Sequence, residues 1–515
     1  MDYDLSSSSM PRSQRNLLTV CLMIATLMQA LDSTIANVAL PYMMGNLSAT
    51  FDQVTWVLTS YVVAAAIMTA PVGWMAARYG RKNLFVVSLI GFTVTSMMCG
   101  AAQSLNQIVI FRLLQGMCGA ALVPLSQSTM LDIFPIQQRG AAMAIWGMGV
   151  MVGPILGPTL GGYLTDMYSW RWVFYVNLPF GVVAVAGLLV LMPKAPLKPD
   201  LRFDWLGFGV LALGIGALQL MLDRGQTLDW FNSREIIVEA VLAGLGFYLF
   251  LVHLFTAPKP FIPPAIFRDL NFSMTMLMMF AVGMVLLASS ALLAPYLQNL
   301  SGYPVEDAGL LMAPRGVGSM IAMMIAGRIL NRVDPRKLMG LGLVFLTWSL
   351  YAMSTWTPDV SARELVAVTM VQGAGLGLVF IPLQIVGFAT LSAAMRTDGT
   401  ALLSLVRNVG SAIGISITSF MLTSGQQTEH ARLAEVATPF NRLLHGPSPL
   451  AHLLNPTTTH GAELLNSMID QQASIIAYNT DFRLMMLAAV LPLVLLFIMR
   501  RPASHNAPKE AHVME

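Results

Sequence analysis

Two ionisable residues inside long apolar segments are the first candidates for chemistry. Asp32 lies about two-thirds of the way along an apolar segment at 17–41, and Arg112 carries the only charge between Ser104 and Leu131. An ionised side chain in the hydrocarbon region is costly and by default indicates a proton or ion pathway. Because loss of water favours the neutral form of a carboxyl group, Asp32 is predicted to carry a proton, whose release the charge of Arg112 would promote.

Each of these residues also has a simpler interpretation. Asp32 could be the counter-charge for a cationic substrate or a structural hydrogen-bonding acid, and Arg112 could extend to the membrane surface. Whether the two side chains touch does not follow from the sequence.

Further polar residues in apolar segments are predicted to line a substrate cavity. Thr34 and Asn37 lie near Asp32 on one predicted helix, whereas Arg315 and Arg407 belong to later segments and could instead satisfy helix-end carbonyls. The predicted cavity residues are Asp32, Thr34, Asn37, Gln115, Arg315, Arg407 and Asn408.

Motifs for enzyme chemistry are absent from the sequence. It contains no GxxxxGK[ST] phosphate-binding loop, no HExxH and no CxxC. We therefore expect neither a catalytic residue nor a bound metal or cofactor, and we expect a proton gradient to supply the energy.

The composition excludes an ordinary soluble protein. Hydrophobic residues make up 56% of the chain and charged residues 11%, whereas soluble proteins contain ~25% charged residues. Segments long enough to cross ~30 Å of hydrocarbon predict about fourteen transmembrane helices, including 53–76 and 338–356. Because this number is even, both termini lie on one side. Most of the 29 Lys and Arg residues fall on that side, which predicts cytoplasmic termini.

An internal repeat predicts two related halves. Gly73 to Leu84 has a counterpart in Gly327 to Leu338, and Gln115, Gly116, Gly119 and Pro124 have counterparts in Gln372, Gly373, Gly377 and Pro382. Both echoes are offset by roughly 255 residues, as parallel repeats would be. The predicted all-α membrane fold has an N-terminal six-helix bundle at 1–193, an inserted helix pair with connectors at 194–264, and a C-terminal six-helix bundle at 265–515. The last bundle includes a long outer loop at 424–481, part of which is expected to be helical.

Two glycine-containing motifs are expected to govern conformational change. Small residues spaced by four allow another helix to approach closely, and prolines permit bending; this motif comprises Gly149, Gly153, Pro154, Gly157, Pro158 and Gly161. A cationic inner loop could close the halves or signal topology alone; it comprises Gly73, Arg78, Gly80, Arg81 and Lys82.

The ordered set of motifs resembles the major facilitator superfamily, in particular its fourteen-helix drug:proton antiporter branch of EmrB/QacA type. The resemblance covers nearly the whole chain and is carried by LDSTIANVALP from Leu31, the inner loop from Gly73, RLLQGMCGAA from Arg112, the Gly-Pro segment from Gly149, and WRWVFYVNLPFG from Trp170. LMLDRGQTLDWF from Leu220 is similar to EmrB-like inner-membrane pumps. One departure is Ala77, which occupies the position where the family usually has an acid.

The resemblance implies a proton-coupled antiporter that exports diverse, mostly apolar or cationic small molecules across the bacterial inner membrane. It implies a role for Arg112 in proton coupling, for which Asp32 is the candidate partner, and a possible periplasmic adaptor and outer-membrane channel as partners. A facilitator or exporter of one metabolite, or a non-transporting membrane sensor, would be compatible with the same fold. We expect no nucleic-acid partner, since no basic stripe is present.

Overall fold

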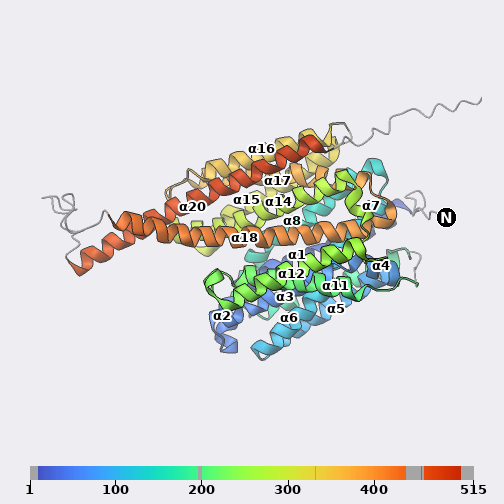
Figure 1. The fold of residues 1–515 in the computed structure, drawn as a ribbon, viewed down its shortest axis with the longest axis horizontal. Helices are drawn as coiled ribbons and strands as arrows, with labels where there is room; N and C mark the ends of the chain where they lie inside the picture. The colour runs from blue at the N-terminus through green and yellow to red at the C-terminus, as the bar shows by residue number, and fades with distance from the viewer. Residues whose placement is uncertain (1–9, 195–199, 331, 436–453, 455–457, 500–515) are drawn as a thin grey trace, which may run out of the picture.

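The computed structural model describes residues 10–194, 200–330, 332–435, 454 and 458–499, and this part of the chain is helical without strands (Figure 1). The N-terminal helices are α1 (Arg12–Leu47), α2 (Phe51–Val54), α3 (Trp56–Thr69), α4 (Val72–Tyr79), α5 (Arg81–Ala101), α6 (Leu105–Gly119), α7 (Leu122–Ile133), α8 (Arg139–Met167), α9 (Trp172–Tyr175) and α10 (Asn177–Leu191). The remaining helices are α11 (Trp205–Arg224), α12 (Arg234–Thr256), α13 (Ala265–Arg268), α14 (Leu270–Pro295), α15 (Val305–Ile329), α16 (Pro335–Met353), α17 (Ala362–Ala389), α18 (Arg396–Ala434) and α20 (Thr459–Ile498).

The helices fit the predicted number of membrane spans. Within the described ranges, 12 helices are long and apolar enough to cross a membrane. The pair α3 and α4 adds a thirteenth span, bent by 59°. Helix α16 lies at the span predicted for 338–356, so the structure accommodates the predicted fourteen.

The bend between α3 and α4 corrects the prediction of one straight helix at 53–76. Helix α3 ends at Thr69 and α4 begins at Val72, directly after Pro71. Proline has no backbone N–H and its ring clashes with the preceding turn, which explains the bend.

The two copies of the second echo, which contain Gly116 and Gly373, pack in the same way. A Cβ atom on Gly116 of α6 would lie 2.3 Å from the backbone oxygen of Tyr61 in α3. A Cβ atom on Gly373 of α17 would lie 1.8 Å from the backbone oxygen of Arg315 in α15. Both glycines thus allow close helix contact at equivalent places, as expected for the two pseudo-symmetric bundles of the major facilitator fold.

The inserted helices α11 and α12 pack against each other and against both bundles. A Cβ atom on Gly246 of α12 would lie 2.5 Å from the nitrogen of Gly214 in α11, so the two helices cross closely. The hydroxyl of Ser416 in α18 donates to the backbone oxygen of Leu222 at 3.0 Å. On the other side, Thr59 of α3 hydrogen-bonds to Asp223. The pair therefore covers a seam between α3 and α18.

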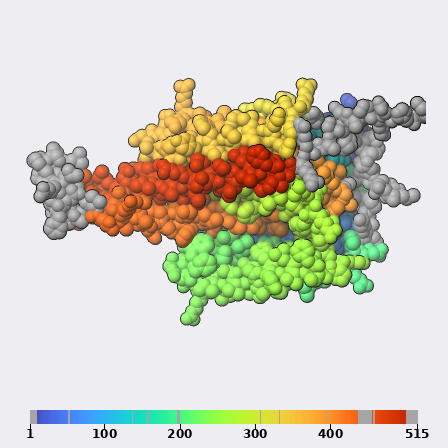
Figure 2. Space-filling model, turned by 45° about the horizontal axis from the view of Figure 1, so that its top comes forward, coloured from blue at the N-terminus to red at the C-terminus, as the bar shows by residue number. Residues whose placement is uncertain are grey.

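Helices α18 and α20 continue well beyond the other helices at one end of the molecule (Figures 1 and 2). They run through much of the predicted outer loop at 424–481, because residues 424–434 and 459–481 are helical; 436–453 and 455–457 lie outside the described residues. Gln426 donates to Ser474 at 3.2 Å, and His430 contacts Asn466 at 3.0 Å. Polar contacts thus join the two helices along this projecting part.

Candidate functional site

Asp32 lies at the centre of a buried hydrogen-bond network formed by α1, α6 and α10. Arg112 donates from Nη1 to Asp32 Oδ2 at 2.6 Å, and Gln115 donates from Nε2 to Oδ1 at 2.8 Å. Asn177, the first residue of α10, also donates to Oδ1, at 3.3 Å. The Asp32 side chain is fully buried, so protein groups rather than water compensate its charge.

Arg112 is held by several groups besides Asp32. Its Nε donates to the backbone oxygen of Val57 at 3.0 Å, and its Nη1 donates to Gln115 Oε1 at 2.9 Å. The guanidinium carbon lies 4.1 Å from the ring centroid of Tyr61, which is a favourable cation–π distance. The side chain is 1% exposed, so Arg112 points into the protein and does not extend to the membrane surface.

The charges of Asp32 and Arg112 compensate each other inside the protein. Removing one partner of a buried ion pair costs about 3–5 kcal/mol, because the other charge is left uncompensated. Protonation of Asp32 removes the negative charge that faces Arg112. The ion pair therefore holds α1 and α6 together while both residues are charged.

Two predicted cavity residues on α1 do not join this network. Thr34 donates from Oγ1 to the backbone oxygen of Leu31 at 3.0 Å and to that of Gly153 in α8 at 3.3 Å. Asn37 is exposed. Of the predicted cavity residues, the structure thus brings together only Asp32 and Gln115.

The predicted cavity residues of the C-terminal bundle lie elsewhere. Arg315 of α15 donates to the hydroxyls of Ser290 and Ser289 at 2.6 and 2.9 Å, both on α14. Arg407 and Asn408 of α18 are partly exposed. Arg315 therefore forms a separate buried polar cluster that joins α14 to α15.

Sequence reasoning did not single out Asn177 and Ser96. Asn177 also donates to the hydroxyl of Ser96 at 3.0 Å, and Ser96 donates to the backbone oxygen of Phe174 at 2.8 Å. Asn177 is a single amide within an apolar segment. The argument applied to Asp32, that an isolated polar group in an apolar helix needs a partner, would have identified it.

The small-residue motif of α8 faces α1, which carries Asp32. A Cβ atom on Gly153 would lie 2.6 Å from the carbonyl carbon of Ala30, and one on Gly157 would lie 2.1 Å from Thr34 Oγ1. Further along α8, Gly149 and Gly161 lie against Met23 and Ile35, and Pro154 and Pro158 lie within the helix. The motif therefore determines how closely α1 approaches α8.

The inner-loop residues each contact a different part of the structure. Gly80 has φ 88° between α4 and α5, a conformation that favours glycine. A Cβ atom on Gly73 would lie 1.6 Å from Asp398 Oδ1 of α18, so only glycine fits there. Lys82 donates to the backbone oxygen of Leu189 at 2.6 Å, and Arg78 donates to that of Leu201 at 3.2 Å.

Asp132 of α7 joins the two bundles at this end of the molecule. Arg81 of the inner loop motif pairs with one carboxylate oxygen, and Arg396 of α18 donates to the other at 2.6 Å. Nearby, Gln127 donates to Gln384 at 2.6 Å across the bundles. An acid that the sequence analysis did not name thus forms a cross-bundle ion pair in a chain that has alanine at position 77.

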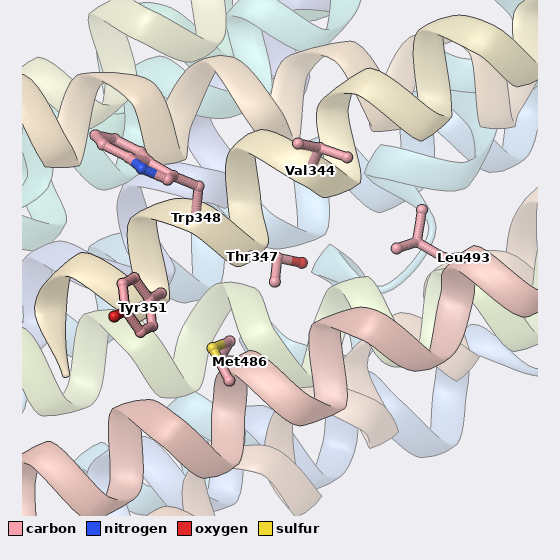
Figure 3. Close-up of a pocket in the computed structure, with 6 residues that line it drawn as sticks. All are labelled: Val344, Thr347, Trp348, Tyr351, Met486 and Leu493. Carbon is pink, nitrogen blue, oxygen red and sulfur yellow. The ribbon is translucent and has the colours of Figure 1, made fainter.

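A shallow apolar pocket on the outside of the C-terminal bundle is separate from this network. It has a volume of about 290 Å³ and lies between α16 and α20 (Figure 3). Its lining residues are Val344, Thr347, Trp348, Tyr351, Met486 and Leu493. Their apolar character and the 50% exposure of Trp348 are typical of a lipid-facing surface.

Comparisons with known proteins identify the family. The model of the Major Facilitator Superfamily matches residues 22–415. Multidrug export protein EmrB of Escherichia coli (strain K12) is 36% identical over 472 residues, covering 91% of this chain and 92% of that protein. Fatty acid resistance protein FarB of Neisseria gonorrhoeae is 33% identical over 467 residues, covering 90% and 92%.

A solved structure supports the fold. The human organic anion transporter MFSD10 matches with a TM-score of 0.58 and 13% sequence identity, covering 95% of this chain and 100% of that chain. The family match over most of the chain, the similarity to EmrB and the helical architecture agree. The chain belongs to the major facilitator superfamily.

Proposed function

We propose that the protein is a proton-coupled antiporter that exports diverse, mostly apolar or cationic small molecules across the inner membrane. The similarity to multidrug export proteins supports the transport of such molecules. The single observation that supports proton coupling is the fully buried ion pair of Asp32 and Arg112. It acts as a transporter and not as an enzyme.

The proposed cycle uses Asp32 as the proton carrier. A proton binds to the carboxylate, the attraction to Arg112 weakens, and α1 and α6 rearrange. Release of the proton restores the ion pair. Proton binding and substrate binding depend on the same conformational change. A gradient that protonates Asp32 from one side therefore drives export of substrate in the opposite direction.

Contacts at the inner-loop end support alternating access. The pairs Asp132–Arg396 and Gln127–Gln384 join the bundles there, so this state is closed at that end. In our proposal this end faces the cytoplasm together with both termini, in keeping with its cations Arg78, Arg81 and Lys82.

Substitution of Asp32 by asparagine tests the proposal. Asp32→Asn keeps the volume but cannot exchange a proton, so we expect energised export to be abolished while membrane insertion persists. The assay is uptake of a neutral fluorescent substrate into inverted vesicles with an imposed pH gradient. Asp229→Asn, which changes an exposed carboxylate in a turn, is the matched control. Full-rate export by Asp32→Asn would overturn the assignment.

The partners remain part of the proposal. We assign the projecting hairpin of α18 and α20 either to a periplasmic adaptor, which would lead to an outer-membrane channel, or to a cover over the outer mouth of the cavity. Its polar contacts, such as Gln426 with Ser474, support a structure that stands in water.

A further inference from the structure

A second pocket, which is polar, lies at the inner-loop end, between α4 and the connector that precedes α11. It has a volume of about 390 Å³. Helix α4 contributes Trp74, Arg78 and Tyr79, and the connector with the start of α11 contributes Leu201, Arg202, Phe203 and Trp205. None of these residues takes part in the Asp32 network, and only Arg78 belongs to the inner loop motif.

The positive charges of Arg78 and Arg202 in this pocket are available to bind an anion. Arg78 donates from Nη1 to the backbone oxygen of Leu201, which leaves most of its five N–H donors available. Among the described residues, neither Arg78 nor Arg202 forms an ion pair, in contrast to Arg81 and Arg396, which share Asp132.

Acidic residues beside the pocket do not neutralise these arginines. Asp204 accepts hydrogen bonds from the backbone nitrogens of Gly207 and Phe261 and contacts His253 at 2.9 Å. Asp200 is exposed, and no ion pair joins it to either arginine in the described part of the chain. The pocket is therefore cationic.

Aromatic rings form the remaining wall. Trp74 and Phe203 have ring centroids 4.5 Å apart, and Phe203 and Trp205 have centroids 4.7 Å apart. The Trp205 ring is 75% exposed and Leu206 beside it is 62% exposed, on the apolar helix α11. The indole N–H of Trp74 is buried without a hydrogen-bond partner in the described structure. Tryptophan and tyrosine beside exposed apolar residues are typical of the membrane–water interface.

We propose that this pocket binds the phosphodiester of an anionic phospholipid, with Arg78 and Arg202 on the phosphate and the acyl chains along Trp205 and Leu206. Guanidinium groups match phosphate oxygens in a bidentate manner. Free phosphate offers the same chemistry to the arginines, but it would leave the exposed apolar wall unused. A basic pocket between membrane helices is a suitable headgroup site. The bound lipid fastens the inserted pair to α4.

The experiment measures lipid binding to the purified full-length protein in detergent. Native mass spectrometry counts retained lipids, and thermal unfolding gives the stabilisation, with phosphatidylglycerol, phosphatidylcholine and inorganic phosphate as separate probes. The double variant Arg78→Gln/Arg202→Gln removes the cations. The matched control, Arg328→Gln/Arg332→Gln, removes the same charge from exposed positions at the same end, outside the pocket.

We expect phosphatidylglycerol to bind and stabilise the native protein and the control, and to bind about tenfold or more weakly to the double variant. Trp205→Ala, which alters an exposed ring, should weaken lipid binding and not phosphate binding, and it keeps the test valid if the double variant does not fold. Equal binding by double variant and control would overturn the site. Equal stabilisation by phosphatidylcholine would overturn headgroup recognition, and equal stabilisation by phosphate would overturn the lipid as occupant.

Discussion

At the scale of single residues, three side chains donate hydrogen bonds to the Asp32 carboxylate and define its network. Oδ2 receives Arg112, and Oδ1 receives both Gln115 and Asn177. Asn177 has a second role because it also bonds to Ser96. It therefore positions the acid relative to α5 and α10 without carrying charge.

We predict that Asn177→Ala impairs transport through loss of positioning. The substitution removes two buried hydrogen bonds, and a buried group left without its partner costs about 1–3 kcal/mol. We expect a lower apparent melting temperature and slower export, with the protein still inserted. Asn177→Ser, which retains a short donor, should recover part of both properties.

Asn106→Ala is the control for this substitution, because Asn106 is exposed. Melting curves in detergent and transport in proteoliposomes give the two readouts. Wild-type behaviour of Asn177→Ala in both would show that Gln115 and Arg112 suffice to hold Asp32.

The individual residues show what sequence reasoning can reach. Asp32 and Arg112 were identifiable because each is a lone charge in an apolar segment. The contact between the two side chains could not be predicted, because α1 and α6 are separated in the chain and only the packed bundle brings them together. Thr34 was placed in the cavity by its proximity to Asp32, yet it faces α8, because residues two apart on a helix point in different directions.

At the scale of helices, the contact between α1 and α8 depends on missing side chains. Backbone atoms of Ala30 and Leu31 lie within 2.6 and 2.8 Å of a Cβ atom on Gly153. Backbone cannot move aside as a flexible side chain can, so the helices must separate if this glycine is replaced.

We predict that Gly153→Ala destabilises the protein by about 1–3 kcal/mol through overpacking and slows transport. Gly153→Leu and Gly157→Leu should disable transport. Gly162→Ala on the same helix is the matched control, because no atom lies within 4 Å of a Cβ atom there. Melting temperature and export rate are measured for each, and normal turnover by both leucine variants would mean that α8 does not need close contact with α1.

Helix boundaries divide into those that hydropathy reveals and those that it does not. The apolar segments marked most membrane spans, because length and low charge are local properties. Hydropathy does not mark the continuation of α18, since Gln426 to Ala434 is polar and leaves no hydropathy signal. Pro71 is a sequence signal for the break within 53–76, because proline cannot donate the backbone hydrogen bond that would continue the helix.

At the scale of the whole molecule, Asp132 determines how strongly the bundles are joined at the inner-loop end. Arg81 belongs to the same bundle as Asp132, whereas Arg396 belongs to the other. No local pattern links Asp132 to a residue so distant in sequence, so the ion pair could be found only in the folded chain.

We predict that Arg396→Gln weakens closure at this end more than Arg81→Gln does, because only the former removes the cross-bundle pair. Both side chains of that pair are partly exposed, so the expected effect is about 1 kcal/mol. Hydrogen–deuterium exchange at the start of α18 measures it, and Arg81→Gln is the control. Equal exchange in the two variants would show that other contacts, such as Gln127 with Gln384, hold the bundles closed.

The projecting hairpin allows a final test at the same scale. Beyond the contact of Gly425 with Ala477, α20 continues for about 27 Å towards its first residue, at 1.5 Å per residue. Replacing 429–470 by a Gly/Ser bridge removes this projection but keeps the bond between Gln426 and Ser474. The matched control replaces only 436–457, which tests the connecting sequence alone.

The outcomes of this excision separate the two roles assigned to the hairpin. Whole-cell resistance and transport in proteoliposomes are measured for both variants. If the hairpin binds an adaptor, resistance falls while transport in proteoliposomes persists, because the reconstituted protein needs no partner. If it covers the cavity mouth, transport changes in both assays, because access to the cavity is altered in either membrane. Unchanged behaviour in both assays would contradict both roles. The hairpin would then be a solvated linker, because its loss would affect neither substrate access to the cavity nor binding of an adaptor.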